Sequence, residues 1–143
     1  MSLVVDASVA FKWFVPSEQY ALEATALLRH ETTLFAPDML IAEVCNTAWR
    51  SARLGRIQPQ QATTIAAVLP GLFASLTGAA SLAPRAVAIA RELNHPVYDC
   101  LYLALAEARG VHLVTADGRL LAKLRGSPWA RTTVALADYT PGA

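Results

Sequence analysis

Apolar and polar positions along the first part of the chain predict a short buried strand followed by helices. Residues 3–5 form an uninterrupted apolar run that ends at Asp6. The run predicts a strand, and the pattern over 7–14 predicts a helix that stops before Pro16. Residues 18–30 place apolar side chains at helical spacing, which predicts a second, amphipathic helix.

The next segment repeats this strand and helix arrangement. A brief apolar run over 34–36 predicts a strand. Asp38 is expected to cap the N-terminus of a helix that continues to about Leu54, because Gly55 is a typical helix end. Glu43 would then lie about one turn into this helix.

Prolines divide the middle of the chain. A helix is expected to begin after Pro59 and to end near Pro70, and residues 75–77 form a weak strand pattern. We expect Pro84 to open a further helix that ends at Leu93, because proline is favoured in the first turn of a helix.

The last third of the chain carries the clearest periodicity. Residues 97–109 predict a helix with one apolar stripe. The stripe consists of Leu101, Tyr102, Leu105 and Ala108. A strong strand is expected over 111–115, a short helix over 119–124 and a final strand over 132–135.

These elements alternate between strand and helix without an internal repeat or a linker. We therefore expect a single domain over residues 1–143, because a chain of this length is sufficient for one compact hydrophobic core. Alternating strands and helices predict an α/β fold, in which helices cover both faces of a parallel sheet.

Residues 62–84 contain no charged side chain and would be long enough to cross a membrane. Pro70 and Gly71 interrupt this stretch, and no aromatic or basic flank supports insertion. The start of the chain lacks the pattern of a secretory signal. We expect a cytoplasmic protein with no membrane segment.

Composition adds information about association and redox state. Hydrophobic residues make up 55% of the chain and charged residues 16%, which predicts a well-filled core or self-association as a dimer. The net charge of +1 excludes a broadly basic nucleic-acid coat, so nucleic-acid contacts would need local patches. Cys45 and Cys100 are expected to be free thiols.

Three aspartates occupy comparable positions in the predicted fold. Asp6 follows the first strand, Asp117 follows the strand over 111–115, and Asp99 lies in the first turn of the helix over 97–109. In open parallel sheets such positions meet at the carboxyl edge of the strands. Glu43, near the start of its helix, is expected to join them.

Carboxylates that meet in a partly buried site repel one another unless a cation neutralises them. Ligands that are all oxygen favour Mg²⁺ or Mn²⁺, and such ions suit phosphodiester hydrolysis. The alternative is that each aspartate is only a helix cap and that Glu43 is a solvated helix residue.

Four short segments resemble the blocks of the PIN domain, and specifically the VapC-like toxins of bacterial and archaeal toxin–antitoxin pairs. The segments are Val-Val-Asp-Ala-Ser-Val over 4–9, Ala-Glu-Val-Cys-Asn over 42–46, Val-Tyr-Asp-Cys-Leu-Tyr-Leu-Ala-Leu-Ala-Glu over 97–107 and Leu-Val-Thr-Ala-Asp-Gly-Arg-Leu over 113–120. They occur in the order of the family and span nearly the whole chain.

The resemblance implies a three-layer α/β/α sandwich, a homodimer, and an endoribonuclease that depends on Mg²⁺ or Mn²⁺. It also implies inhibition by a small VapB-type antitoxin. The acids that match the metal-binding and catalytic quartet of the family are Asp6, Glu43, Asp99 and Asp117. The polar residues that match positions around this quartet, where hydrogen bonds orient the carboxylates, are Ser8, Asn46 and Thr115. Ordinary capping and turn bonding is the alternative role for these three polar residues.

Basic side chains follow two of the acidic segments. They are Arg50, Arg53 and Arg56 after Glu43, and Arg119, Lys123 and Arg125 after Asp117. One hypothesis is that these residues, Arg50, Arg53, Arg119 and Lys123 among them, bind RNA phosphates, and the alternative is a solvated helix face. Lys12 is open to either role.

Large aromatic side chains are expected to pack in the core. They are Trp13, Phe14, Trp49 and Tyr98, and for Trp13 and Trp49 contact with a partner is the alternative. The histidines at 30, 95 and 112 show no ligand spacing, so none is assigned to catalysis.

Two rival functions share the same fold pattern. One is a catalytically silent protein-interaction module, against which the intact quartet argues. The other is a phosphatase with an aspartate nucleophile. Such a phosphatase would need a second acid two residues after Asp6, where Ser8 stands.

Overall fold

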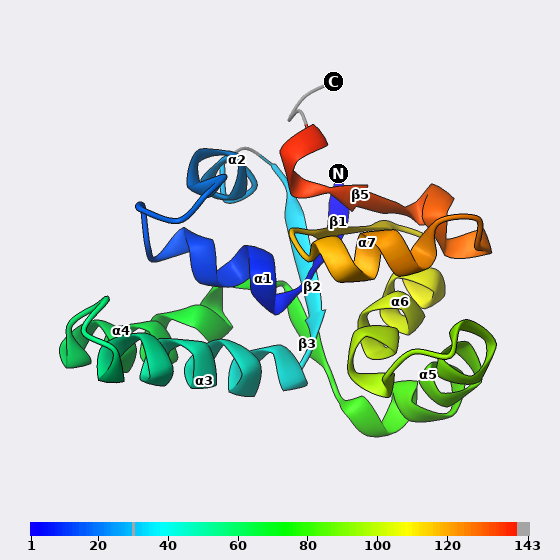
Figure 1. Cartoon of the computed structure of the whole chain (residues 1–143), viewed down its shortest axis with the longest axis horizontal. Coiled ribbons are helices and arrows are strands. Elements are labelled where there is room, and N and C mark those ends of the chain that lie inside the picture. The colour runs from blue at the N-terminus through cyan, green and yellow to red at the C-terminus, as the bar shows by residue number, and fades with distance from the viewer. Residues whose placement is uncertain (30, 140–143) are drawn as a thin grey trace.

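A five-stranded parallel sheet forms the centre of the computed structural model, which describes residues 1–29 and 31–139 (Figure 1). The strand order is β3-β2-β1-β4-β5, and every neighbouring pair is parallel. The strands are β1 (Ser2–Val5), β2 (Thr33–Pro37), β3 (Ser75–Thr77), β4 (His112–Thr115) and β5 (Thr133–Ala135). All the strands predicted from the sequence are present.

Helices cover both faces of this sheet (Figure 1). On one side lie α1 (Ala7–Ala10), α2 (Ala21–Ala26), α3 (Met39–Arg53) and α4 (Pro59–Val68), and on the other side lie α5 (Ala79–Leu93), α6 (Val97–Arg109) and α7 (Gly118–Leu124). Short 3₁₀ segments span Phe11–Trp13 (η1), Leu69–Leu72 (η2), Pro128–Thr132 (η3) and Leu136–Asp138 (η4). The predicted three-layer α/β/α sandwich is confirmed.

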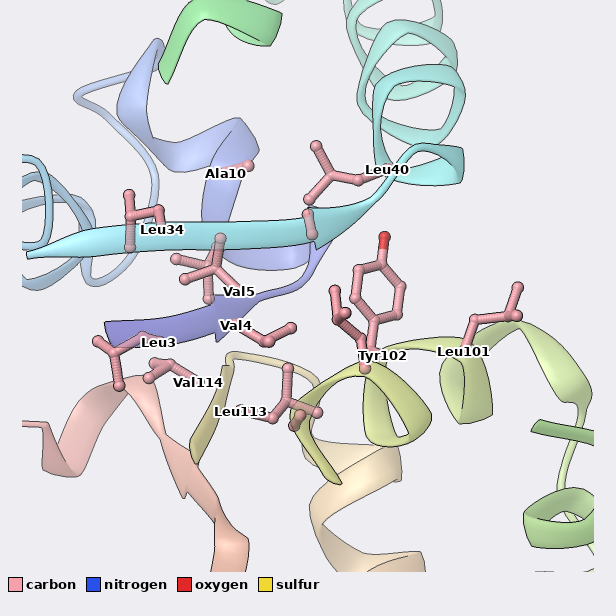
Figure 2. Packing of buried hydrophobic residues seen from close by; sticks show 14 of the residues in the cluster. Leu3, Val4, Val5, Ala10, Leu34, Leu40, Leu101, Tyr102, Leu113 and Val114 are labelled. Carbon is pink, nitrogen blue, oxygen red and sulfur yellow. The ribbon is translucent and has the colours of Figure 1, made fainter. Parts of the chain in front are cut away.

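The apolar strand runs are buried because both faces of the sheet are covered. Leu3, Val4 and Val5 of β1 are each at most 3% exposed. Figure 2 shows Leu40 of α3 on one side of the strands and Tyr102 of α6 on the other. Burial on both faces explains why these strands read as continuous apolar runs rather than as alternating ones.

Helix α6 is the most deeply buried helix of the sandwich. It packs against β1, β2 and β4 on one side and against α5 on the other. Every residue from 100 to 106 is buried, whereas Ala108 is exposed. The predicted single apolar stripe that included Ala108 is therefore wrong, because a helix enclosed on opposite sides buries more than one face.

Helix boundaries differ from the prediction at α2, which is shorter than the expected segment 18–30. Tyr20 has a left-handed φ of 63°, so the helix cannot extend back through it. Residue 30, at the far end of the predicted segment and one of the histidines given no catalytic role, lies outside the described residues.

The start of α5 also differs from the prediction. The helix begins at Ala79, and Pro84 lies inside it on an exposed position. There, water can bond the carbonyl that the missing proline N–H leaves free. Asp38 does not cap its own helix as predicted. Its Oδ1 instead accepts a hydrogen bond from the N–H of Ala79 at 3.2 Å and so caps α5.

Cysteine and aromatic predictions have mixed outcomes. Cys45 and Cys100 are free, as predicted. Trp13 and Phe14 are half-buried against the core, and the indole N–H of Trp13 donates to the Ala24 carbonyl at 2.9 Å. The predicted core positions of Trp49 and Tyr98 are wrong, because their side chains are 54% and 64% exposed on the outer faces of their helices.

Within the described part of the chain, no helix has the length and apolar character needed to cross a bilayer. The uncharged stretch over 62–84 is divided among α4, η2, β3 and the first turns of α5.

Candidate active site

The carboxyl edge of β1 and β4 is the point where the direction of the chain through the sheet reverses. Connections after β1 and β2 lead toward one edge of the sheet, and the connections through α5, α6 and α7 lead back toward the other. Ligand sites of open α/β sheets occur at such a reversal. Val5 is in register with Val114, so that Asp6 and Thr115 are neighbours at this edge.

A cavity of about 420 Å³ opens here, and all four predicted acids line it. They come from four different elements of the chain: Asp6 before α1, Glu43 in α3, Asp99 in α6 and Asp117 before α7. Ser8 and Asn46 also line the cavity, whereas Thr115 lies beneath it and is fully buried. Lys12, which the sequence left open to either role, also lines the cavity, as does Tyr102, to which the sequence analysis gave no functional role.

Asp6 is the most buried of the acids, at 4% exposure. Its Oδ1 accepts hydrogen bonds from the Ser8 hydroxyl at 2.5 Å and from the Val9 N–H at 3.3 Å, and its Oδ2 accepts from the Thr115 hydroxyl. Burial raises the pKa of Asp6 to about 6 although these hydrogen bonds lower it, and the negative charge of Asp99 raises it further.

Ser8 and Thr115 connect Asp6 to the turn that follows β4. The Ser8 hydroxyl accepts a hydrogen bond from the N–H of Ala116 at 3.0 Å, and the Thr115 hydroxyl accepts one from the N–H of Asp117 at 3.0 Å. Each hydroxyl therefore donates to Asp6 and accepts from this turn. The positions of Asp6 and Asp117 are linked through these two side chains.

Glu43 is held from across the sheet. Tyr102 is 1% exposed. Its hydroxyl donates a hydrogen bond to Glu43 Oε1 at 2.7 Å. Burial raises the pKa of Glu43, the hydrogen bond from Tyr102 lowers it, and the charge of Asp99 raises it. The sequence pattern indicated Tyr102 only as a core position, because its partner lies 59 positions away.

Asp99 pairs with a histidine that the sequence analysis left without a role. His95 Nε2 lies 2.6 Å from Asp99 Oδ2, and the histidine side chain is 15% exposed. The only signal in the sequence was the spacing of four positions. Pro96 between them marks a helix start rather than a helix interior, which weakens that signal.

Asp117 both lines the cavity and caps α7. Its Oδ1 accepts from the N–H groups of Arg119 and Leu120 at 2.9 and 3.3 Å. Asp6 likewise caps α1. Capping and a place in the cavity are thus compatible for both aspartates, and the two readings of the sequence do not exclude each other.

The charge balance of the cavity is strongly negative. The one basic side chain among its lining residues is Lys12, whose Nζ lies 3.6 Å from Glu18 Oε1. Oxygen donors of this kind suit a hard divalent cation that keeps some of its water. Across residues 1–29 and 31–139, no group of three or more acidic, histidine or cysteine side chains is arranged closely enough to hold a metal ion by itself.

The basic residues that follow the acidic segments do not line this cavity, whereas Lys12 does. Arg50, Arg53, Arg119 and Lys123 are all exposed, and none lines it. The Arg53 guanidinium lies 5.0 Å from the centroid of the Trp49 ring. Their contact with RNA stays a prediction.

A parallel α/β/α sandwich with an acid-lined cavity at the carboxyl edge of its strands defines the structural class of this protein. The model of the PIN domain matches residues 3–126. The chain belongs to the PIN domain family.

One curated relative is similar in sequence, and two solved structures are similar in fold. Ribonuclease VapC3 of Pyrobaculum aerophilum is 34% identical over 125 residues, which cover 86% of this chain and 95% of the relative. A crystal structure of PAE2754 from the same organism has a TM-score of 0.68 at 24% identity and covers 96% of this chain and 85% of its own. A toxin–antitoxin complex from Klebsiella pneumoniae has a TM-score of 0.60 at 15% identity, and the match covers 94% of this chain and 97% of the chain in that complex.

Asp6→Asn is expected to change how stability depends on pH in metal-free buffer. The folded protein holds the Asp6 proton with a pKa of about 6, above the ordinary value of 3.8. The wild type therefore loses stability as the pH rises through this interval. The asparagine variant lacks that loss, so it should be more stable at pH 7 by up to about 3 kcal/mol and equally stable near pH 3.5. Urea unfolding at both pH values measures this, and an equal difference at both would contradict it.

Tyr102→Phe removes only the hydroxyl that donates to Glu43. A carboxylate left without its donor costs about 1–3 kcal/mol of unfolding free energy. The loss should be larger at pH 7 than near pH 4, because the hydrogen bond from Tyr102 lowers the pKa of Glu43 and so favours its ionised form. Tyr98→Phe, at an exposed position of the same helix, serves as the control and should change stability at neither pH.

Proposed function

We propose that this chain is a VapC-type endoribonuclease that hydrolyses RNA phosphodiester bonds with Mg²⁺ or Mn²⁺. The observation that carries the proposal is that Asp6, Glu43, Asp99 and Asp117 line one cavity at the strand edge. The similarity to ribonuclease VapC3 across most of both chains supports the same activity.

The four acids would hold the ion. When bound, such an ion would act as a Lewis acid that polarises a phosphate oxygen, and its positive charge would favour ionisation of an attacking water. Burial is the main cause of the raised pKa values of Asp6 and Glu43, and the negative charge of Asp99 adds to it. A bound cation would favour the ionised form of both carboxylates, which supports this role.

The neighbours of the acids keep the carboxylates in place. Ser8 and Thr115 fix Asp6, and Tyr102 fixes Glu43. His95 contacts Asp99. Hydrogen bonds of this kind orient carboxylate ligands, and their loss typically lowers metal affinity or activity by about 10–100-fold. Asn46 also lines the cavity, and its role in orienting the acids stays a prediction.

The partners we propose are an RNA substrate, a small VapB-type antitoxin and a second copy of the chain. We propose that the protein acts in the cytoplasm. The Klebsiella pneumoniae complex with the same fold supports the antitoxin. Trp49 of α3 and Leu54, which directly follows this helix, are 54% and 53% exposed, and exposed apolar side chains favour a protein contact. Analytical ultracentrifugation of the purified protein checks the dimer, and a monomer at micromolar concentration would contradict it.

Asp99→Asn is expected to abolish RNA cleavage. Loss of one carboxylate ligand should lower the rate by about 100-fold or more, beyond the range seen for orienting neighbours. The assay incubates purified protein with single-stranded RNA and Mg²⁺ or Mn²⁺, with EDTA as the metal-free arm. Asp138→Asn, at an exposed acid outside the cavity, is the matched control. Cleavage that survives both EDTA and Asp99→Asn would refute the proposal.

Adding the metal should stabilise the folded protein. A ligand at 100 times its dissociation constant raises the unfolding free energy by about 2.7 kcal/mol. We expect Mn²⁺ or Mg²⁺ to raise the melting temperature at pH 7.5, and this increase to be lost in Asp99→Asn. A silent interaction module would show no such shift, so thermal scans and calorimetric titration separate the two functions.

A further inference from the structure

A second cavity of about 430 Å³ adjoins the acidic one. Phe11, Glu18 and Thr47 line both cavities. The two spaces are therefore neighbours that share a wall, and a chain molecule bound over the acids can continue into the second cavity.

The lining of this second cavity differs from that of the first. Its own residues include the hydroxyls of Ser17 and Ser51, the guanidinium of Arg56, and the apolar side chains of Val15 and Ile57. Glu18 is the only acid among them, and it is paired with Lys12 at 3.6 Å. The unpaired charge that the second cavity offers is therefore the positive charge of Arg56.

The end of α3 sets the position of Arg56. Gly55 has a φ of 75°, a left-handed conformation that reverses the chain at the helix end. The N–H of Arg56 then donates to the Ser51 carbonyl at 2.8 Å, and that of Gly55 donates to the Ala52 carbonyl at 3.0 Å. Ile57 follows at 7% exposure. Buried packing and a hydrogen-bonded helix end thus hold the backbone of Arg56 at the cavity.

We propose that this second cavity binds the nucleotide next to the cleaved phosphodiester, with Arg56 on its phosphate. The inference rests on the proposed ribonuclease function and adds the place where the RNA strand leaves the acids. Pockets for small ligands have volumes of about 300–1,000 Å³, which suits one nucleotide. A guanidinium binds a phosphate through two parallel hydrogen bonds, and serine hydroxyls suit ribose oxygens.

The test compares RNA of two lengths in an Asp99→Asn background, in which RNA is expected to bind without being cleaved. Fluorescence anisotropy measures binding of an eight-nucleotide single strand of mixed sequence, and competition measures binding of a dinucleoside monophosphate, whose single phosphate is the one that lies over the acids. Arg56→Ala should weaken binding of the longer RNA about tenfold and leave binding of the dinucleoside monophosphate unchanged, because the short RNA has no further phosphate for Arg56. Loss of one phosphate contact should also make the slope of log K against log salt concentration shallower by about 0.7.

Two further variants control for charge and for folding. Arg131→Ala, an exposed arginine of η3 outside both cavities, should change neither affinity nor slope. Arg56→Lys keeps the charge and should restore the salt slope. Circular dichroism of each variant should match the parent.

The outcomes distinguish the two proposals. If the wild type cleaves no RNA with either ion, the proposed function itself fails. If the wild type cleaves RNA but Arg56→Ala binds the longer strand as tightly as Arg131→Ala does, the second cavity is not a nucleotide site. An equal loss of affinity for both lengths would likewise overturn the inference, because Arg56 would then act on the acidic cavity.

Discussion

The burial of the Asp6 carboxylate is the constraint on which the rest of the site depends. A charge removed from water is tolerated only when polar groups surround it, and here Ser8, Thr115 and the N–H of Val9 provide them. The same two hydroxyls accept hydrogen bonds from the chain that follows β4. Because the groups that solvate Asp6 also fix the turn at Asp117, two acids that are far apart in sequence share one rigid support.

The other two acids depend on helix α6 in a similar way. Asp99 is carried by its first turn, and Tyr102, one turn later, reaches across to Glu43 of α3. Because α6 is enclosed between the sheet and α5, neither residue can shift without disturbing the core. The geometry of the acids is thus determined by the packing of the sandwich, which is how a rigid scaffold positions a reactive site.

Much of the fold could be predicted from the sequence, because buried parallel strands such as 3–5 and 111–115 are local apolar runs. The common position of the acids could also be predicted, since carboxyl strand ends meet at one edge. What could not be predicted depends on contacts between distant segments. Asp38 caps a helix that begins 41 residues later, and Tyr102 bonds Glu43 over 59 residues. Such partners leave no periodic signal, and the position of Pro84 inside α5 even indicated the wrong helix start.

The way in which the acids are held also bears on how they would bind a metal. Among the hydrogen bonds of the described residues, Glu43 uses Oε1, Asp99 uses Oδ2 and Asp117 uses Oδ1. Each of these three therefore has a second oxygen without a hydrogen bond among the described residues. In the proposed function, an ion bound by these oxygens would retain open positions for water and phosphate oxygens. Metal affinity and RNA affinity would then reinforce each other, because the phosphate completes a coordination shell that the protein alone leaves open.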